Sequence, residues 1–380
     1  MDTVFGADRY PRYAQLRVHE PVSTVIAPPG DIGGGEPMTL VSRYDHVRDA
    51  LSDPRLRVEP PARHQPLMNG EMPRILLNSD PPGHTRLRQA VNGLFGRHRV
   101  TALRPAVEAT ANRLLDALPS NGTVDLLARF ALPLPLTVIC ELLGVPEADR
   151  AQFRGWTVQF FDADGDSAES LGHMGEYLAG LLRRKRAEPG DDLTSELLAR
   201  PHDLTDPELV GTLLLLLVAG HETSTNLIGN GLLALLTHPA QLARLRHEPG
   251  LIVDAVEELL RFDSPVAHAV PRYATEDLEI GGVQIAAGST VLLALGSANH
   301  DMTLADGLDV SRLPSRHLAF GHGPHYCLGA PLARLEGQVA FRTLLRRLPR
   351  IALAVPANSL RWRTSLTMRG LVDLPVRIFE

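Results

Sequence analysis

The sequence predicts a mainly α-helical protein with a smaller β part. Segments 206–237 and 329–348 carry long runs of residues with helical periodicity. Segment 270–294 instead alternates, or is rich in β-branched residues, between GG and AG turns. The β part is therefore expected to be short and to lie between helices, within one mostly helical architecture.

The elements follow in order along the chain. Two short strands, VSTVIA and MTLVS, flank a proline- and glycine-rich loop at 28–37, and a long loop occupies 59–74. Asp80 can cap the next helix, with Pro81 and Pro82 in its first turn. Further helices are expected near 101–117, 135–144, 147–161, 168–187, 192–199 and 206–237, as a pair within 239–262, and at 329–348, with two closing strands within 360–379.

Composition bounds the class of protein. The 380 residues carry a net charge of −6, which gives no indication of a nucleic-acid partner. The most apolar run, residues 213–220, is far shorter than the ~18 apolar residues of a membrane-spanning helix, so no membrane partner is expected. Two cysteines do not form a disulfide framework, and no secretion signal is visible, so a cytoplasmic location is expected. One of them, Cys140, is expected to be a buried structural residue.

The other cysteine lies in the stretch FGHGPHYCLGAPLARLE, residues 320–336. Glycines at 321, 323 and 329 allow positive φ angles and a close approach to a flat group. Cys327 comes just before a helix, and free N–H groups at a helix N-terminus favour a thiolate. Such a thiolate is suited to be the axial ligand of a haem iron.

The whole pattern resembles the haem-binding loop of the cytochrome P-450 superfamily, most closely its soluble bacterial branch, and the resemblance covers nearly the whole chain. It implies haem b bound by Cys327. It also implies one domain, residues 1–380: a triangular helical prism with the haem between the long central helix and the helix after the cysteine. The matching residues are Phe320, Gly321, Gly323, His325, Cys327, Gly329, Leu332, Ala333, Arg334 and Glu336.

The stretch AGHETST places polar residues within the apolar helix 206–237. Glu222 and Thr223 match the acid–alcohol pair of the family, which implies proton delivery to reduced dioxygen. Ala219 and Gly220 are small, which is expected to leave room for dioxygen. The alternative is that the threonine hydroxyl bonds back to a carbonyl one turn earlier and the glutamate faces solvent.

Glu258 and Arg261 share a helix face, and they match the family's Glu-x-x-Arg pair. The resemblance implies a buried structural network behind the cysteine loop, whereas the alternative is a surface ion pair. Segment 298–312 is shorter than usual in the family and lacks its proline and phenylalanine. That departure places the local packing in question.

Haem carries two propionates, so the site needs cations. By resemblance the cations are His84, Arg88, Arg272 and His325. His84 and Arg88 are four apart on one helical face, and together the four residues are expected to form an anion clamp. Individually each is also compatible with a solvated surface residue.

The expected activity is a haem-thiolate monooxygenase that inserts one oxygen atom of O2 into a C–H or C=C bond of an apolar small molecule, such as a secondary metabolite. Ferredoxin and its reductase are the expected electron donors, and a group of arginines is a candidate docking surface. These arginines are Arg97, Arg99, Arg342, Arg346, Arg347 and Arg350. A peroxide-driven peroxygenase, an oxidative coupling enzyme and a non-catalytic haem-binding module stay open as alternatives.

Substrate contacts are expected from one stripe of the central helix, from the segment after the Glu-x-x-Arg helix, from the C-terminal turn and from the long loop. Residues at such spacing are also compatible with plain core. The expected pocket residues are Leu67, Met68, Met72, Leu215, Val218, Ala219, Ala267, His268, Thr367 and Met368.

Overall fold

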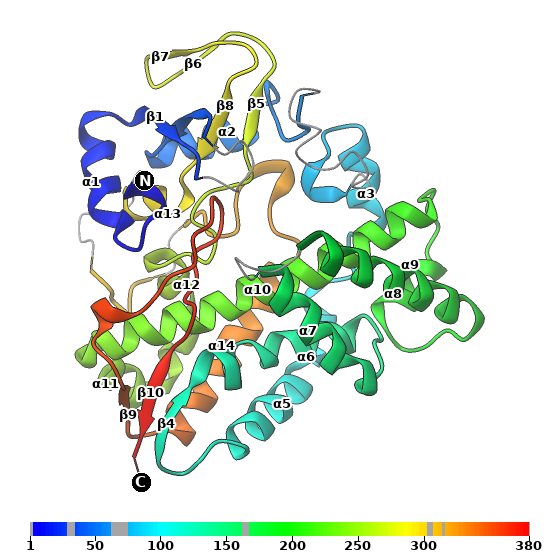
Figure 1. Ribbon diagram of the computed structural model, residues 1–380, viewed down its shortest axis with the longest axis vertical. Coiled ribbons are helices and arrows are strands. Elements are labelled where there is room, and N and C mark those ends of the chain that lie inside the picture. The colour runs from blue at the N-terminus through cyan, green and yellow to red at the C-terminus, as the bar shows by residue number, and fades with distance from the viewer. Residues whose placement is uncertain are drawn as a thin grey trace.

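The computed structural model describes residues 3–28, 35–61, 75–161, 167–301, 307–313 and 316–379. Helices dominate, and the strands gather mainly at one corner of the molecule, near the N-terminus (Figure 1). Helix α10 (Asp206–Thr237) crosses the centre, with α14 (Ala330–Arg347) packed behind it. The expected fold class, mainly α with a small β part, is confirmed.

The remaining helices lie around this pair. Their bounds are α1 Arg9–His19, α2 Tyr44–Ser52, α3 Gly83–Val91, α4 Arg97–Ala102, α5 Arg104–Asp116, α6 Pro133–Leu142, α7 Arg150–Phe161, α8 Ser167–Ala187, α9 Leu193–Ala199, α11 Pro239–His247, α12 Ile252–Phe262 and α13 Leu295–Asp301.

Helix α10 forms because nearly every turn has an apolar residue to bury. It packs against α6, α8 and α14, and these contacts place most of its apolar side chains in or against the largest core cluster. Its start is fixed by a capping box, in which Thr205 and Glu208 exchange hydrogen bonds. Among the described residues no helix is long and apolar enough to cross a membrane.

In the described residues, three small sheets complete the fold. The largest has the order β1-β2-β8-β5-β3, in which only β2 and β8 run parallel. A second, β4-β10-β9, joins the middle of the chain to its C-terminal end, and β6 with β7 forms a hairpin. The bounds are β1 Val22–Ile26, β2 Pro37–Val41, β3 Leu56–Arg57, β4 Gly122–Asp125, β5 Arg272–Ala274, β6 Leu278–Ile280, β7 Val283–Ile285, β8 Thr290–Leu293, β9 Ile351–Leu353 and β10 Pro375–Ile378.

Two local expectations are corrected. The Asp80 carboxylate does not cap α3; it accepts hydrogen bonds from the N–H groups of Val58 and Glu59 and so joins the preceding strand to the helix. Only the last part of 360–379 is a strand. Residues 362–371 form an irregular hairpin closed by the bridge between Trp362 and Leu371.

Candidate functional site

The cysteine loop is shaped by two glycines in the left-handed region. Gly321 has φ +72° and Gly323 has φ +71°, and a Cβ on Gly323 would lie 2.6 Å from Ser52 Oγ of α2. The loop closes when the Cys327 N–H donates to the Phe320 carbonyl at 3.0 Å. Gly329 differs from the expectation: its φ is −81°, so left-handed backbone does not explain it.

Burial dominates the electrostatics of Cys327. It raises the pKa of the thiol, and the N–H groups of Gly329 and Ala330 together with Arg88 oppose this only in part. The N–H groups at the helix N-terminus therefore favour the thiolate, as expected, but burial outweighs them. A metal cation on the sulfur would supply the missing stabilisation, because metal-bound thiols are deprotonated. In the described part of the chain, no cluster of His, Cys, Asp and Glu resembles a purely protein-built metal site.

A group of His and Arg side chains lies near the cysteine loop, and two of them, His84 and Arg272, are buried. His84 Nε2 and Arg272 Nη1 are buried and have no hydrogen-bond partner among the described residues. The rings of His84 and His325 lie 4.2 Å apart between centroids. Burial, together with Arg272, His84 and Arg88, lowers the pKa of His325 to about 3, and burial lowers the pKa of Arg272 to about 10. A bound anion would satisfy the two unpaired donors and relieve the mutual repulsion in this cluster.

Glu222 is held by a residue that the sequence did not suggest. Its Oε1 accepts from Arg363 Nη1 at 2.6 Å and, more weakly, from Asn226 Nδ2 at 3.4 Å. Burial raises the pKa of Glu222, while Arg363 opposes the shift. Arg363 is about one-third exposed, so the pair joins a buried acid to the surface. No spacing in the sequence signals a pair 141 residues apart.

Thr223 adopts the back-bonded arrangement in this structure. Its Oγ1 donates to the Ala219 carbonyl at 2.8 Å, which leaves the oxygen free to accept but not to donate. Ala219 is exposed although it lies midway along the central helix. Gly220 does not share this opening, because a Cβ there would meet the Ile139 side chain of α6 at 3.1 Å. The expected space beside α10 therefore lies at Ala219 and Thr223.

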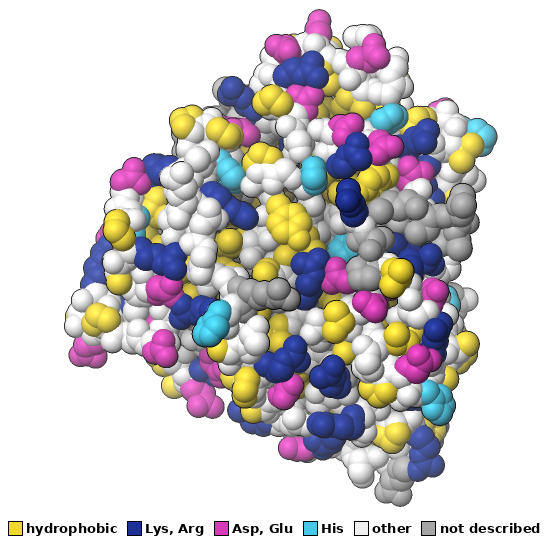
Figure 2. All heavy atoms as spheres, turned by 180° about the vertical axis from the view of Figure 1, so that it is seen from behind, with side chains coloured by type: hydrophobic (Ala, Val, Ile, Leu, Met, Phe, Trp, Pro, Cys, Tyr) yellow, Lys and Arg dark blue, Asp and Glu magenta, His cyan; other side chains and the backbone are white. Residues whose placement is uncertain are grey.

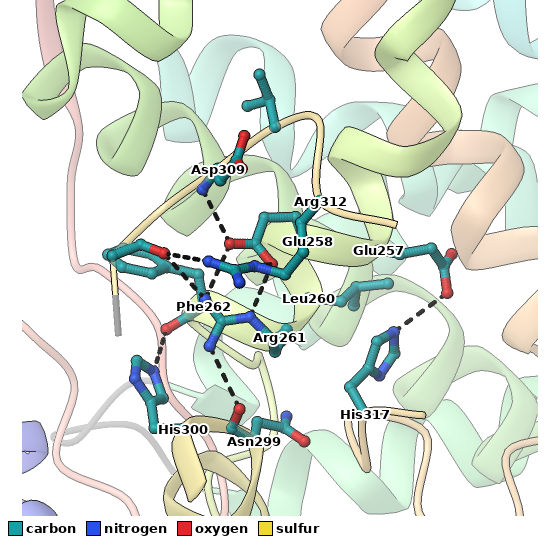
Figure 3. Close-up of polar contacts among 12 residues, drawn as sticks. Glu257, Glu258, Leu260, Arg261, Phe262, Asn299, His300, Asp309, Arg312 and His317 are labelled. Atoms are coloured by element: carbon teal, nitrogen blue, oxygen red, sulfur yellow. Dashed lines mark hydrogen bonds and ion pairs between the residues drawn. The ribbon is translucent and has the colours of Figure 1, made fainter. Parts of the chain in front are cut away.

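Glu258 and Arg261 form the expected buried network (Figure 3). Arg261 donates two hydrogen bonds to the Glu258 carboxylate, at 2.7 and 2.9 Å, and both side chains are at most 1% exposed. Arg312 Nε reaches the same carboxylate at 3.1 Å, and the Asp309 N–H donates to it at 3.0 Å. The shortened segment therefore still reaches the pair through its described residues 307–312.

The next acid on α12 ties this helix to the cysteine loop. Glu257 accepts two hydrogen bonds from Arg334 of α14, at 2.7 and 2.8 Å, and contacts His317 Nε2 at 3.1 Å. Burial acts to raise the pKa of Glu257, but His317 and Arg334 outweigh it and lower the pKa to about 2. Arg334 also lies over the Phe320 ring, 4.4 Å from its centroid. Glu257 of α12 therefore positions Phe320 through Arg334.

Replacing Arg261 by methionine is expected to lower the free energy of unfolding by about 3–5 kcal/mol, because Glu258 would stay buried with half its donors removed. Arg347→Met is the matched control, since Arg347 pairs with Asp116 on the surface and should cost at most ~1 kcal/mol. Denaturant unfolding of the haem-loaded proteins measures both. Equal losses in the two variants would contradict a special role for the buried network.

Glu336 is a buried acid whose contacts do not satisfy it. It is 0% exposed on α14, and neither oxygen has a well-formed hydrogen bond within the described ranges. Burial raises the pKa of Glu336 to about 8, and Ser224 of α10 opposes this only in part. The side chain is therefore mostly protonated in the folded protein at neutral pH, whereas its unfolded counterpart, with a pKa of 4.5, is ionised.

This predicts a pH dependence of stability. The folded state binds the proton more tightly, so the stability associated with Glu336 is complete below about pH 4.5 and is lost as pH rises toward about 8. Glu336→Gln should remove up to ~1.4 kcal/mol of dependence per pH unit in that window. Glu208→Gln is the control, because the pKa of Glu208 is lowered to about 2 by Arg86 and lies outside the window. Parallel unfolding curves for wild type and Glu336→Gln between pH 5.5 and 7.5 would refute the assignment.

The expected substrate residues are placed unevenly. Leu215, Val218, Thr367 and Met368 are partly exposed, whereas Ala267 is buried. His268 is fully buried, and both of its ring nitrogens are hydrogen-bonded. Its side chain therefore supports neighbouring segments and does not line the pocket. Leu67, Met68 and Met72 lie outside the described residues.

Comparison with known proteins identifies the class. The Cytochrome P450 family model matches residues 181–304 and 306–350. The chain is 45% identical to a vitamin D(3) 25-hydroxylase of Pseudonocardia autotrophica, covering 98% of this chain and 94% of the relative. It is 43% identical to a mycinamicin IV hydroxylase/epoxidase of Micromonospora griseorubida, with 98% and 96% covered. Among solved structures, the tirandamycin C-bound P450 monooxygenase TamI is similar, with a TM-score of 0.92, 44% identity, and coverage of 100% and 99%.

The chain belongs to the cytochrome P450 family. It is a monooxygenase whose cofactor is haem b, and it acts on an apolar small molecule and O2 with electrons from a redox partner. The residues present fit that cofactor: a partly exposed cysteine thiol lacks a cation, and buried donors on His84 and Arg272 lack an anion.

Proposed function

We propose that this cytochrome P450 hydroxylates or epoxidises a bulky apolar secondary metabolite, of polyketide or macrolide type, within one catalytic unit of residues 1–380. The observation that carries the proposal is the retained acid–alcohol pair, Glu222 and Thr223, beside an exposed Ala219 in mid-helix. The names of the relatives support the substrate class, since they act on mycinamicin IV and vitamin D(3), and one solved relative holds tirandamycin C.

Each site residue has a role in this proposal. Cys327 binds the iron of the haem, and His84, Arg88, Arg272 and His325 bind its propionates. When bound, the haem supplies the activation of O2 and the oxidation of the substrate.

Glu222 and Thr223, neighbours on α10, would handle protons in the bound complex. Glu222 takes a proton from water beside the partly exposed Arg363 and passes it toward Thr223, while Arg363 keeps its own protons and only holds the carboxylate in place. Thr223, held to Ala219 through its hydrogen, offers its oxygen as an acceptor and so orders a proton-donating water. Because Glu222 and Thr223 are adjacent on α10, this transfer needs no rearrangement of the helices.

We further propose that the electron donor is a ferredoxin and that the protein is cytoplasmic. Arg342, Arg346 and Arg350 are exposed on or just after α14, the helix that follows Cys327. On the side of the molecule opposite to that in Figure 1, Lys and Arg side chains gather over the lower half (Figure 2). Arg347 and Arg99 add less positive charge than expected, because they pair with Asp116 and Glu196. Two free cysteines are compatible with a reducing compartment.

Arg342→Glu is expected to slow ferredoxin-supported reduction about tenfold at low salt, because it reverses a charge on the docking surface. The rate of reduction by dithionite should not change. Arg183→Glu, a matched exposed arginine on α8, is the control. If both variants slow ferredoxin equally, the surface near α14 is not the docking site.

The direct test of the proposed function is a substrate screen. Tirandamycin C, mycinamicin IV, vitamin D3 and myristic acid are titrated against the haem-loaded protein, and the haem spin-state shift is recorded. The compounds that bind are then turned over with ferredoxin, reductase, NADPH and isotopically labelled O2. One labelled oxygen atom in the product supports the proposal. An unlabelled, coupled product, or turnover by peroxide at the same rate, would contradict it.

A further inference from the structure

The C-terminal hairpin, residues 362–371, is fastened along the central helix. Glu222, Asn226 and Asn230 are spaced one turn apart on α10, and each meets the hairpin. Glu222 binds Arg363, and Asn230 Nδ2 donates to the Arg369 carbonyl at 3.0 Å. Asn226 lies so close to Gly370 that a Cβ there would be 2.2 Å from Asn226 Oδ1. The base of the hairpin is therefore fixed beside the proton-delivering acid.

The tip of the hairpin is held by a different segment. The Thr367 carbonyl accepts from the N–H groups of Ala267 and His268, at 2.8 and 3.2 Å. Val266 forms a bridge with Met368. Thr367 and Met368 are partly exposed, while the residues on either side of them are buried. Two partly exposed side chains are thus presented on a tip whose place depends on segment 265–268.

Segment 265–268 is in turn anchored by Tyr13 of the N-terminal helix α1. His268 Nδ1 lies 2.6 Å from the Leu366 carbonyl, and its Nε2 lies 2.8 Å from Tyr13 Oη. A carbonyl only accepts, so Nδ1 carries the hydrogen and Nε2 must accept from the Tyr13 hydroxyl. Burial lowers the pKa of His268 to about 3, which keeps the ring neutral and this tautomer in place. Tyr13 and His268 are both 0% exposed.

A second connection runs in parallel through Arg369. Its Nε donates to Asp263 Oδ1 at 2.5 Å, and Tyr10 Oη donates to the same oxygen at 2.8 Å. Its Nη1 donates to the Ala7 carbonyl at 3.1 Å. The guanidinium also lies 3.7 Å from the centroid of the Trp362 ring, at the hairpin base. The hairpin tip is thus connected to Tyr13 through His268, and the hairpin base is connected to Ala7 and Tyr10 through Arg369. The hairpin reaches up from β10 toward α1 in Figure 1.

We propose that residues Ala7–Tyr13 are a specificity-determining element, in which Tyr13 and Tyr10 act as positioning residues that set the place of Thr367 and Met368 through His268 and Arg369. This proposal rests on the proposed function in one respect: the hairpin tip faces the substrate. The affinity of a bulky ligand that reaches the tip therefore depends on the position of α1, whereas the affinity of a small ligand at the iron does not. The N-terminal helix thus contributes to substrate choice without touching substrate.

Tyr13→Phe tests the proposal because it removes the hydroxyl that lies 2.8 Å from His268 Nε2; the same hydroxyl also lies 3.3 Å from the Val4 carbonyl, within the N-terminal segment itself. Two probes of the haem-loaded protein are titrated optically: 4-phenylimidazole, which extends away from the iron, and imidazole, which does not. We expect the Kd of 4-phenylimidazole to rise about threefold to tenfold, the effect of one lost buried hydrogen bond. The Kd of imidazole should stay unchanged, as should the spectrum of the reduced CO complex.

Two further variants make the test specific. His268→Asn keeps a donor for the Leu366 carbonyl but loses the acceptor for Tyr13, so adding Tyr13→Phe to it should change nothing further. Tyr44→Phe is the control, since it likewise removes one hydrogen-bonded tyrosine hydroxyl, which donates to the Arg316 carbonyl at 2.8 Å and lies outside the hairpin. If Tyr13→Phe does not fold, Tyr10→Phe provides the same readout through Asp263 and Arg369.

The outcomes separate cleanly. A lower melting temperature with an unchanged ratio of the two Kd values would mean that Tyr13 only stabilises the fold, and the proposal would be overturned. Equal weakening in Tyr44→Phe would overturn it as well. If the wild-type protein does not show the CO spectrum of thiolate-ligated haem, the proposed function is refuted. The ratio of the two Kd values in the variants would still show whether Tyr13 positions the hairpin.

Discussion

A Cys327→Ala variant is expected to lose monooxygenase activity entirely and to lose the CO spectrum of thiolate-ligated haem. The reason is chemical: the Cys327 sulfur is the group that can donate electron density to the iron, and alanine offers no ligand. Haem retention should weaken but not vanish, because the cationic cluster around His84 and Arg272 is untouched. Absorbance of the reduced CO complex and product yield measure the two effects.

Cys140→Ala is the matched control for this change. Cys140 is 0% exposed in the core, and burial raises the pKa of its thiol to about 12, so it stays a neutral thiol. We expect this variant to keep the spectrum and the activity, at a modest cost in stability from a small cavity. A thiolate spectrum that survives Cys327→Ala but not Cys140→Ala would reverse the ligand assignment.

Glu222→Gln is expected to lower product formation about 100-fold or more while haem binding and the CO spectrum stay normal. Glutamine keeps an oxygen that can accept from Arg363 at the same place, but it cannot carry a proton. Reducing equivalents should then leave as peroxide or water and not enter product. NADPH consumption, peroxide and product are measured in the same reaction to obtain the coupling ratio.

Glu208→Gln controls for the loss of an ion-paired glutamate on the same helix. Glu208 pairs with Arg86 and caps the start of α10, far along the helix from Glu222. Its removal should affect stability and leave coupling intact. Normal coupling in Glu222→Gln would show that protons reach the site by another route.

Contiguous motifs were predictable from the sequence. The cysteine loop and the pair Glu258 and Arg261 are local in the chain, so their spacing alone defines a turn or a helix face. The central helix was also predictable, because its length and apolar content leave few alternatives. Helix α1, RYPRYAQLRVH, was missed because its polar and proline content hides three buried positions, Arg9, Tyr13 and Leu16.

What could not be predicted depends on contacts between distant segments. Arg363 reaches Glu222 only because the C-terminal hairpin packs along α10, and no local pattern encodes that approach. Gly220 looks like space for dioxygen in the sequence, but its neighbour is Ile139 of α6. The rise in the pKa of Cys327 likewise comes from burial by surrounding elements, which outweighs the N–H groups of its own helix.

The central claim is that Cys327 is the thiolate ligand of a bound haem. The most direct measurement is the absorption spectrum of the purified, reduced protein under CO. The structure predicts the long-wavelength Soret maximum typical of thiolate-ligated haem, because Cys327 is the candidate ligand that the loop and α14 place at the site. A maximum at the shorter wavelength typical of histidine ligation, in freshly prepared protein, would contradict the account.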